Sequence, residues 1–153
     1  PRLIELLNML SNHIEIETFS REPRPFSLHK SIKHSQNLSD EEIEIGYSEA
    51  KYSICYSDFE GFGLPAFDAM KNGCIIFTTD NLGNRDYIQP SKNCIMLDGS
   101  DAVSDSKCIL DFIKMTPGNA KEIEKSGRVT CSALLKKYDN QAILDVYGNL
   151  LNS

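Results

Sequence analysis

The segment 60–65 carries the residue types best suited to chemistry in this chain, because it reads Glu-Gly-Phe-Gly-Leu-Pro. Its two glycines lack the Cβ atoms that would keep a ligand away from the backbone, and its proline suits the first turn of a helix. A loop of this kind between a strand and a helix turns backbone N–H groups toward a ligand at the positive helix end. We therefore expect a phosphate-binding loop, and a tight turn without a ligand is the alternative.

Two carboxylates flank this loop. Asp68 follows Glu60 by eight positions and is expected in the first turn or so of the helix, so that both acids bracket one pocket. A carboxylate accepts hydrogen bonds from two neighbouring hydroxyl groups, such as those of a sugar or a ribose. The alternatives are a solvated loop acid for Glu60 and, for Asp68, an acid that the helix dipole favours without a ligand. Ser57 and Thr79, at strand ends, are further candidates for hydroxyl contacts.

The hydrophobic pattern indicates the elements that position these residues. The expected strands cover 13–19, 31–36, 51–56, 74–79 and 93–97, and the expected helices cover 2–10, 40–50, 66–71, 105–115, 119–135 and 140–151. Alternating strands and helices are typical of an α/β fold with a parallel, doubly wound sheet, here expected as a single domain over 1–153. Ligands bind such sheets outside the carboxyl ends of the strands, where the loops after Tyr56 and Thr79 lie.

Local signals set two helix boundaries. Ser39 with Glu42 three residues later forms a capping box, which predicts that a helix begins directly after Ser39. The Pro-Gly pair at 117–118 is expected to stop the helix over 105–115.

Composition excludes several classes of partner. The net charge of −6 argues against a nucleic-acid partner, since phosphate backbones are bound by clustered Lys and Arg. No apolar run approaches the roughly 20 residues that span a bilayer, so direct membrane insertion is not expected. The five cysteines and three histidines show no metal-ligand spacing. We expect reduced, mostly buried thiols in a cytoplasmic protein, with no metal and no other cofactor.

The run from Tyr56 to Asn84 resembles the signature of the family-four retaining glycosyltransferases. That signature is a Glu, seven residues and a second Glu within EGFGLPxxEAMAxGxPVI. The similarity extends from about Asp40 to the end of the chain. It implies a Rossmann-like parallel sheet flanked by helices, which forms the C-terminal, donor-binding half of a GT-B fold.

The resemblance also implies roles for single residues. Glu60 is the catalytic residue that contacts hydroxyls of the donor sugar, and Asp68 stands where a second Glu grips the ribose of the nucleotide. The loop backbone holds the diphosphate or the sugar. The turn over 80–85 corresponds loosely to a second piece of the site, with Arg85 as a source of positive charge. The donor-binding residues implied beside Asp68 are Gly61, Phe62, Gly63, Leu64, Ser57 and Thr79.

By the same resemblance, the chain lacks the first strand of its sheet, the basic loop after that strand and the N-terminal, acceptor-binding half. The implied activity is retaining transfer of a hexosyl group from a nucleotide-sugar to an acceptor hydroxyl, in surface polysaccharide or glycoconjugate synthesis. The enzyme is expected in the cytoplasm, at the inner membrane surface through the absent half, and the isolated chain is expected to be inactive.

Three other functions are weighed against this transferase. A non-catalytic module that binds a nucleotide-sugar or docks on another subunit is the principal alternative. An epimerase or a phosphorylase with the same fold is disfavoured by the loop motif. A dinucleotide-binding enzyme is disfavoured because no GxGxxG follows the first strand.

Overall fold

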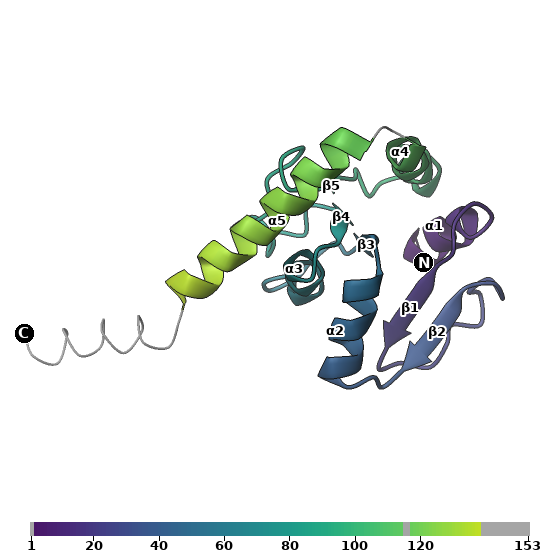
Figure 1. The fold of residues 1–153 in the computed structure, drawn as a ribbon. Coiled ribbons are helices and arrows are strands. Elements are labelled where there is room, and N and C mark those ends of the chain that lie inside the picture. The colour runs from purple at the N-terminus through teal and green to yellow at the C-terminus, as the bar shows by residue number, and fades with distance from the viewer. Residues whose placement is uncertain (1, 115–116, 139–153) are drawn as a thin grey trace, which may run out of the picture.

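The computed structural model describes residues 2–114 and 117–138. Helices and strands alternate along this part of the chain, as the hydrophobic pattern predicts (Figure 1). In chain order they are α1 (Arg2–Leu10), β1 (Glu17–Ser20), β2 (Lys33–Gln36), α2 (Asp40–Glu49), β3 (Tyr52–Cys55), α3 (Leu64–Lys71), β4 (Ile75–Thr78), β5 (Cys94–Met96), α4 (Ala102–Lys114) and α5 (Pro117–Lys137).

The strands form two parallel sheets. One sheet pairs β1 with β2, and the other has the order β3-β4-β5. In Figure 1, β1 lies between β2 and the three-stranded sheet. The parallel, doubly wound α/β architecture is therefore confirmed, and the described strands leave a break between the two sheets.

Within 2–114 and 117–138, neither of the two strands that border this break has a partner on that side. The carbonyls of Lys51 and Cys55 accept bonds from the segment of β4, and alternate residues of a parallel strand point in opposite directions. The backbone groups of Tyr52 and Ile54 therefore point away from β4, and those of Phe19 on β1 point away from β2. All of β3 is only half-buried, whereas β4 is buried along its whole length.

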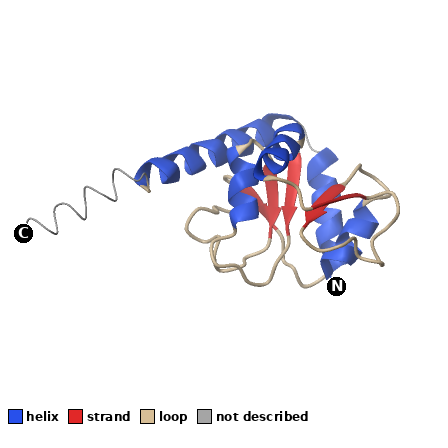
Figure 2. Ribbon diagram, turned by 90° about the horizontal axis from the view of Figure 1, so that it is seen from below, coloured by secondary structure: helices blue, strands red, loops and turns tan. Residues whose placement is uncertain are grey.

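The helices cover both faces of the strands (Figure 2). On one face, Phe77 of β4 packs in a cluster with Leu6 of α1 and Ile109 of α4. On the other face, the adjacent Ile76 packs in a cluster with Met70 of α3 and with residues of α2 and α5. Because neighbouring residues of β4 serve opposite faces, this strand needs the continuous apolar run that its sequence shows.

Several predicted boundaries are wrong. The strand expected over 13–19 begins only at Glu17, because the amides of His13 and Ile14 bond to the carbonyl of Leu10 and continue a turn after α1. The strand expected over 31–36 begins at Lys33. These short strands pair over four residues each.

The helices begin earlier than expected. Asp101 accepts bonds from the amides of Val103 and Ser104 at 3.2 and 2.9 Å, and this cap moves the start of α4 to Ala102. The helix α5 begins at Pro117 and not at 119, because proline suits a first helical turn. The helix expected over 66–71 begins at Leu64. The helix expected over 140–151 lies outside the described residues.

All five cysteines are free thiols, and Cys74, Cys94 and Cys131 are buried. Burial raises the pKa of the Cys94 thiol to about 12, so that it stays protonated. In the described part of the chain, no helix has both the length and the apolar character needed to cross a membrane.

Candidate functional site

The loops that follow β3 and β4 pack directly on each other at the carboxyl ends of the strands. The amide of Glu60 donates to the carbonyl of Asn81 at 3.0 Å, and Glu60 and Leu82 form an isolated parallel bridge. A Cβ atom on Gly83 would lie 2.4 Å from the carbonyl oxygen of Glu60. Glycine at 83 thus permits the close approach that locks the loop over 60–65 in place.

Unbonded amides gather at the start of α3. The carbonyl of Gly63 accepts bonds from Ala66 and Phe67, and this residue takes a left-handed backbone with φ of 80° before the helix. Among the described residues, we find no acceptor for the amides of the four residues that lead into the helix. These amides lie at the positive end of α3, as predicted for a site that binds phosphate, and they belong to Gly61, Phe62, Gly63 and Leu64.

Three aromatic rings pack on one another at this loop. The ring of Phe62 lies 5.5 Å from that of Phe67 and 5.1 Å from that of Tyr87. The Tyr87 hydroxyl donates to the carbonyl of Gly63 at 2.7 Å. Leu64, by contrast, is 61% exposed. Phe62 therefore serves through packing, while its amide stays available.

The two predicted carboxylates come from different elements, Glu60 from the loop after β3 and Asp68 from α3. Asp68 lies about one turn into α3, because this helix begins at Leu64 and not at 66. Burial raises the pKa of the Asp68 carboxyl, and the negative charge of Glu44 on α2 adds to the rise. Burial also raises the pKa of Tyr87, with smaller contributions that include the charges of both Glu60 and Asp68. Both acids thus lie within electrostatic range of one phenol.

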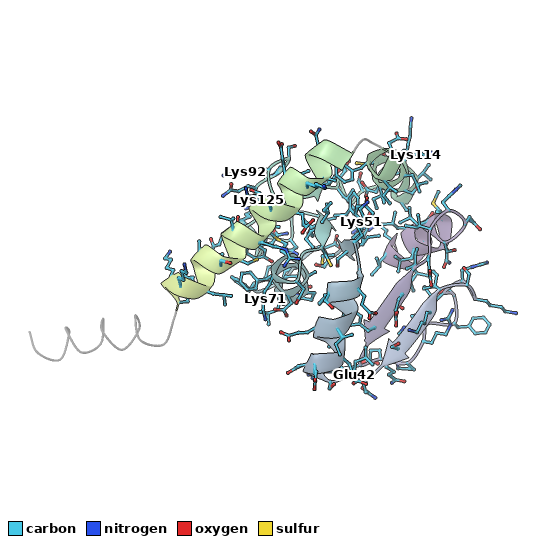
Figure 3. All side chains as sticks on the ribbon, in the orientation of Figure 1. Glu42, Lys51, Lys71, Lys92, Lys114 and Lys125 are labelled. Atoms are coloured by element: carbon cyan, nitrogen blue, oxygen red, sulfur yellow. The ribbon has the colours of Figure 1, made fainter. Side chains whose placement is uncertain are left out.

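An ion pair links α3 to α2. Lys71, at the end of α3 and labelled in Figure 3, donates to the carboxylate of Glu44 at 2.8 Å.

Glu60 is half-buried, and no described residue donates a hydrogen bond to its carboxylate. The Glu60 carboxylate is therefore left to accept bonds from a ligand.

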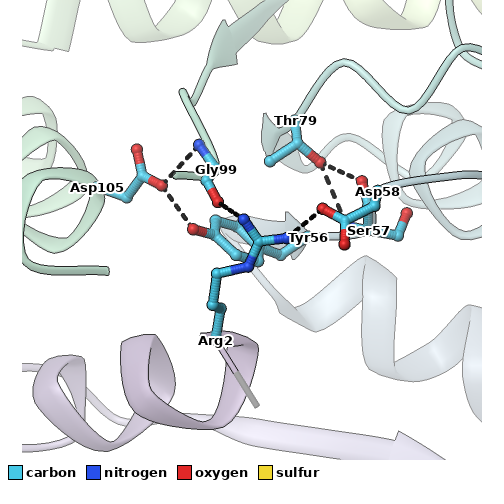
Figure 4. A network of polar contacts seen from close by, with 7 residues as sticks. All are labelled: Arg2, Tyr56, Ser57, Asp58, Thr79, Gly99 and Asp105. Carbon is cyan, nitrogen blue, oxygen red and sulfur yellow. Dashed lines mark hydrogen bonds and ion pairs between the residues drawn. The ribbon is translucent and has the colours of Figure 1, made fainter. Parts of the chain in front are cut away.

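Ser57 and Thr79 meet where β3 and β4 end (Figure 4). The Thr79 hydroxyl donates to the carbonyl of Ser57 at 2.6 Å and accepts from its amide at 3.2 Å. Thr79 is 6% exposed, so its hydroxyl joins the two loops. The Ser57 hydroxyl accepts a longer bond of 3.4 Å from the Asn81 side chain.

The structure adds one cation that the sequence analysis did not single out. Arg2, the first residue of α1, donates to the carbonyl of Gly99 and to the carboxylate of Asp58, each at 2.5 Å (Figure 4). A helix that precedes a parallel strand starts at the carboxyl edge of the sheet. This rule could have placed Arg2, at the start of α1, near the loops of the candidate site. By contrast, the predicted cation Arg85 is bonded through two nitrogens to Asp80, at 2.9 and 2.7 Å.

Two surface hollows lie away from this edge. A hollow of about 510 Å³ lies beside α1, and a hollow of about 580 Å³ lies between α4 and α5. The second is lined in part by Lys51 and Lys92, both labelled in Figure 3. Neither hollow includes a residue of the loop over 60–65. Within 2–114 and 117–138, no three His, Cys, Asp or Glu residues are grouped so that they would hold a metal ion.

Comparison with known families points to one group of enzymes. Residues 20–129, more than half of the chain, match the family described as glycosyl transferases group 1. No curated protein matches the sequence.

Solved structures share the fold. The C-terminal domain of LpcC, a glycosyl transferase group 1 family protein from Francisella tularensis, matches with a TM-score of 0.60 and 23% identity, over 69% of this chain and 54% of that one. TarM of S. aureus and the sucrose-phosphate synthase of Thermosynechococcus elongatus each match 99% of this chain with a TM-score of 0.76, at 20% and 19% identity. The matches cover 32% and 41% of those two chains. The chain therefore spans about a third to a half of the structures it resembles.

Proposed function

Because this chain belongs to the glycosyl transferases group 1 family, we propose that it is the C-terminal, donor-binding half of a two-domain GT-B enzyme. That enzyme transfers a hexosyl group from a nucleotide-sugar to an acceptor hydroxyl, with retention at the anomeric carbon. The observation that carries the proposal is the set of unbonded amides from Gly61 to Leu64, which lies at the start of α3. A solved complex of TarM contains UDP, which supports a nucleoside diphosphate as the leaving group.

Each group of the site has a proposed role. The loop amides hold the diphosphate, Glu60 accepts bonds from hydroxyls of the donor sugar, and Asp68 accepts bonds from the ribose. In the reaction, the bond from the anomeric carbon to the diphosphate breaks as the bond to the acceptor oxygen forms, and the proton of the acceptor hydroxyl passes to the departing diphosphate. Negative charge then develops on the diphosphate, and each amide bonded to it contributes about 1.5–3 kcal/mol. We propose that no metal or other cofactor takes part.

The second half of the enzyme supplies the acceptor site and closes the cleft. Without that half, solvent has access to a diphosphate bound on the loop, and water weakens the electrostatic stabilisation of its charge. The isolated chain is therefore expected to bind donor without transferring sugar. The proposed setting is the synthesis of surface polysaccharide or glycoconjugate in the cytoplasm, a reducing compartment that suits the free thiols.

Calorimetric titration tests this proposal. The chain is titrated with UDP, GDP and ADP and with their sugar conjugates, alongside Glu60→Ala, Asp68→Ala and, as a matched control, the exposed Glu41→Ala on α2. We expect one base to dominate, Asp68→Ala to weaken binding of every nucleotide, and Glu60→Ala to weaken only the sugar conjugates. Absence of binding at millimolar ligand, with the fold intact, would favour a subunit-docking module without a donor site.

A further inference from the structure

The geometry points to Asp58 as a displaceable counter-ion of Arg2, which the diphosphate of the donor replaces when it binds. This inference rests on the proposed function and adds two residues, Arg2 and Asp58, that set the affinity for the anionic part of the ligand. Arg2 belongs to α1 and Asp58 to the loop after β3, so the pair joins two elements at the carboxyl edge.

One side of the Arg2 guanidinium is held by a built support. Nη1 donates to the carbonyl of Gly99 at 2.5 Å. The amide of Gly99 donates in turn to Asp105 at 3.0 Å, and the Tyr56 hydroxyl donates to the same carboxylate at 2.7 Å (Figure 4). Asp105 is 3% exposed and also accepts a bond from the amide of Asp98 at 3.1 Å. The Gly99 carbonyl therefore has a fixed position, and it fixes Nη1.

The other side of the guanidinium carries a partner that is easily removed. Nη2 donates to Asp58, whose side chain is 82% exposed, while that of Arg2 is 44% exposed. An exposed pair of this kind contributes little to stability, because water and salt screen it. No other hydrogen bond from a described residue holds the Asp58 carboxylate. Asp58 therefore accepts the bond from Nη2, but no second contact holds its side chain in place.

A diphosphate is the stronger partner for the same nitrogen. It carries more negative charge than one carboxylate, and its several oxygens fit the planar guanidinium in a bidentate manner. Asp58 lies two residues before Glu60, next to the loop whose amides are unbonded. The side-chain nitrogen of Asn81 lies 3.4 Å from the hydroxyl of Ser57, the neighbour of Asp58, and 3.7 Å from the Cβ position of Gly63. We infer that a diphosphate held by that loop reaches Nη2. Arg85, on the neighbouring loop, is already bonded to Asp80 through two nitrogens.

Replacing Asp58 tests the inference through an effect of unusual sign. Asp58→Asn removes the competing charge and keeps the side-chain shape, so we expect it to tighten binding of inorganic pyrophosphate and of UDP several-fold. A contribution of about 1 kcal/mol corresponds to roughly fivefold. Arg2→Gln is expected to weaken both ligands, and uridine, which has no phosphate, is expected to bind all variants equally. Glu17→Gln, which removes the acid of the exposed Glu17–Lys33 ion pair on the two-stranded sheet, is the matched control and is expected to leave pyrophosphate binding unchanged.

The measurement is the dissociation constant from calorimetry, together with the NMR resonance of the Arg2 Nε–H, which should shift when pyrophosphate is added. Equal or weaker binding in Asp58→Asn, or an Arg2 resonance that pyrophosphate leaves in place, would overturn the inference. If pyrophosphate behaves as expected while no nucleotide binds, the counter-ion inference stands and the proposed donor function fails. If nucleotides bind but Asp58→Asn has no effect, the proposed function stands and the counter-ion inference fails.

Discussion

Gly63 sets the direction in which the loop enters α3. Its backbone is left-handed, and a Cβ atom at this position would lie 2.8 Å from the Tyr87 hydroxyl. A non-glycine residue in this conformation costs about 1–2 kcal/mol before any contact is counted. We therefore expect Gly63→Ala to lower the free energy of unfolding by about 1–3 kcal/mol, as measured by urea denaturation.

Gly61 provides the matched control in the same loop. It has no positive φ, and a Cβ atom there would meet nothing within 4 Å. Gly61→Ala is expected to change stability by less than about 0.5 kcal/mol. Equal losses in the two variants would mean that the left-handed turn at Gly63 does not limit the loop.

Asp68 is expected to weaken the fold while it serves the ligand. Burial raises the pKa of its carboxyl above the ordinary value of 3.8. A group with a raised folded pKa contributes stability below its unfolded pKa, and this stability is lost as the pH rises through the folded pKa. We expect Asp68→Asn to raise the free energy of unfolding at neutral pH and to leave it unchanged well below pH 3.8. Urea denaturation at both pH values checks this, and a loss of stability at neutral pH would contradict it.

The loop over 60–65 could be located from the sequence, because the residues that identify it stand next to one another in the chain. Gly61, Gly63 and Glu60 stand in one short motif, and the structure places their backbone at the start of a helix as predicted. Arg2 was missed because its partners are distant in sequence. Asp58 and Gly99 lie 56 and 97 positions away, and only the sheet topology brings them together.

The helix α2 begins with the capping box that the sequence predicts. The Ser39 hydroxyl accepts from the amide of Glu42 at 3.3 Å, and the Glu42 carboxylate accepts from the amide of Ser39 at 2.8 Å. Losing such a cap costs about 0.5–2 kcal/mol, so Ser39→Ala is expected to lower stability by about 1 kcal/mol in thermal unfolding. Ser48→Ala, on the last turn of α2, removes only a bond to the Ile45 carbonyl and is expected to change little.

Strands β4 and β1 show when a hydrophobic pattern predicts where a strand begins and ends. The run over 74–79 predicted β4 well, because a strand buried on both faces must be apolar throughout. The alternating run over 13–19 predicted a strand that starts too early, because the amides of its first two residues bond to the carbonyl of Leu10 in a turn. A period-2 pattern records which side chains face the core, but pairing requires a neighbouring strand, and β2 reaches only from Lys33 to Gln36.

The break between the two sheets has a measurable consequence for the whole molecule. On β3, the backbone of Cys55 points toward β4, whereas that of the adjacent Ile54 points toward the break. We expect the amide of Ile54 to exchange with solvent much faster than the amide of Cys55, as followed by hydrogen exchange and NMR. Similar protection at both residues would show that the free edge of β3 has a partner.

A strand in this break would convert the two parallel sheets into one. Its two edges would pair with β1 and β3, whose backbone groups on that side have no partner among the described residues. The expectation of a further strand rests on the family resemblance alone. Composition and periodicity predict each strand singly and do not reveal which strands pair.

The most direct test of the central claim is to map where a nucleotide-sugar binds, by following backbone amide resonances of the chain during titration with the conjugate that calorimetry favours. We expect the largest shifts at Gly61, Phe62, Gly63 and Leu64, with a smaller shift at Asp68. Shifts confined to the hollow between α4 and α5, or shifts that leave the loop over 60–65 unchanged, would contradict it.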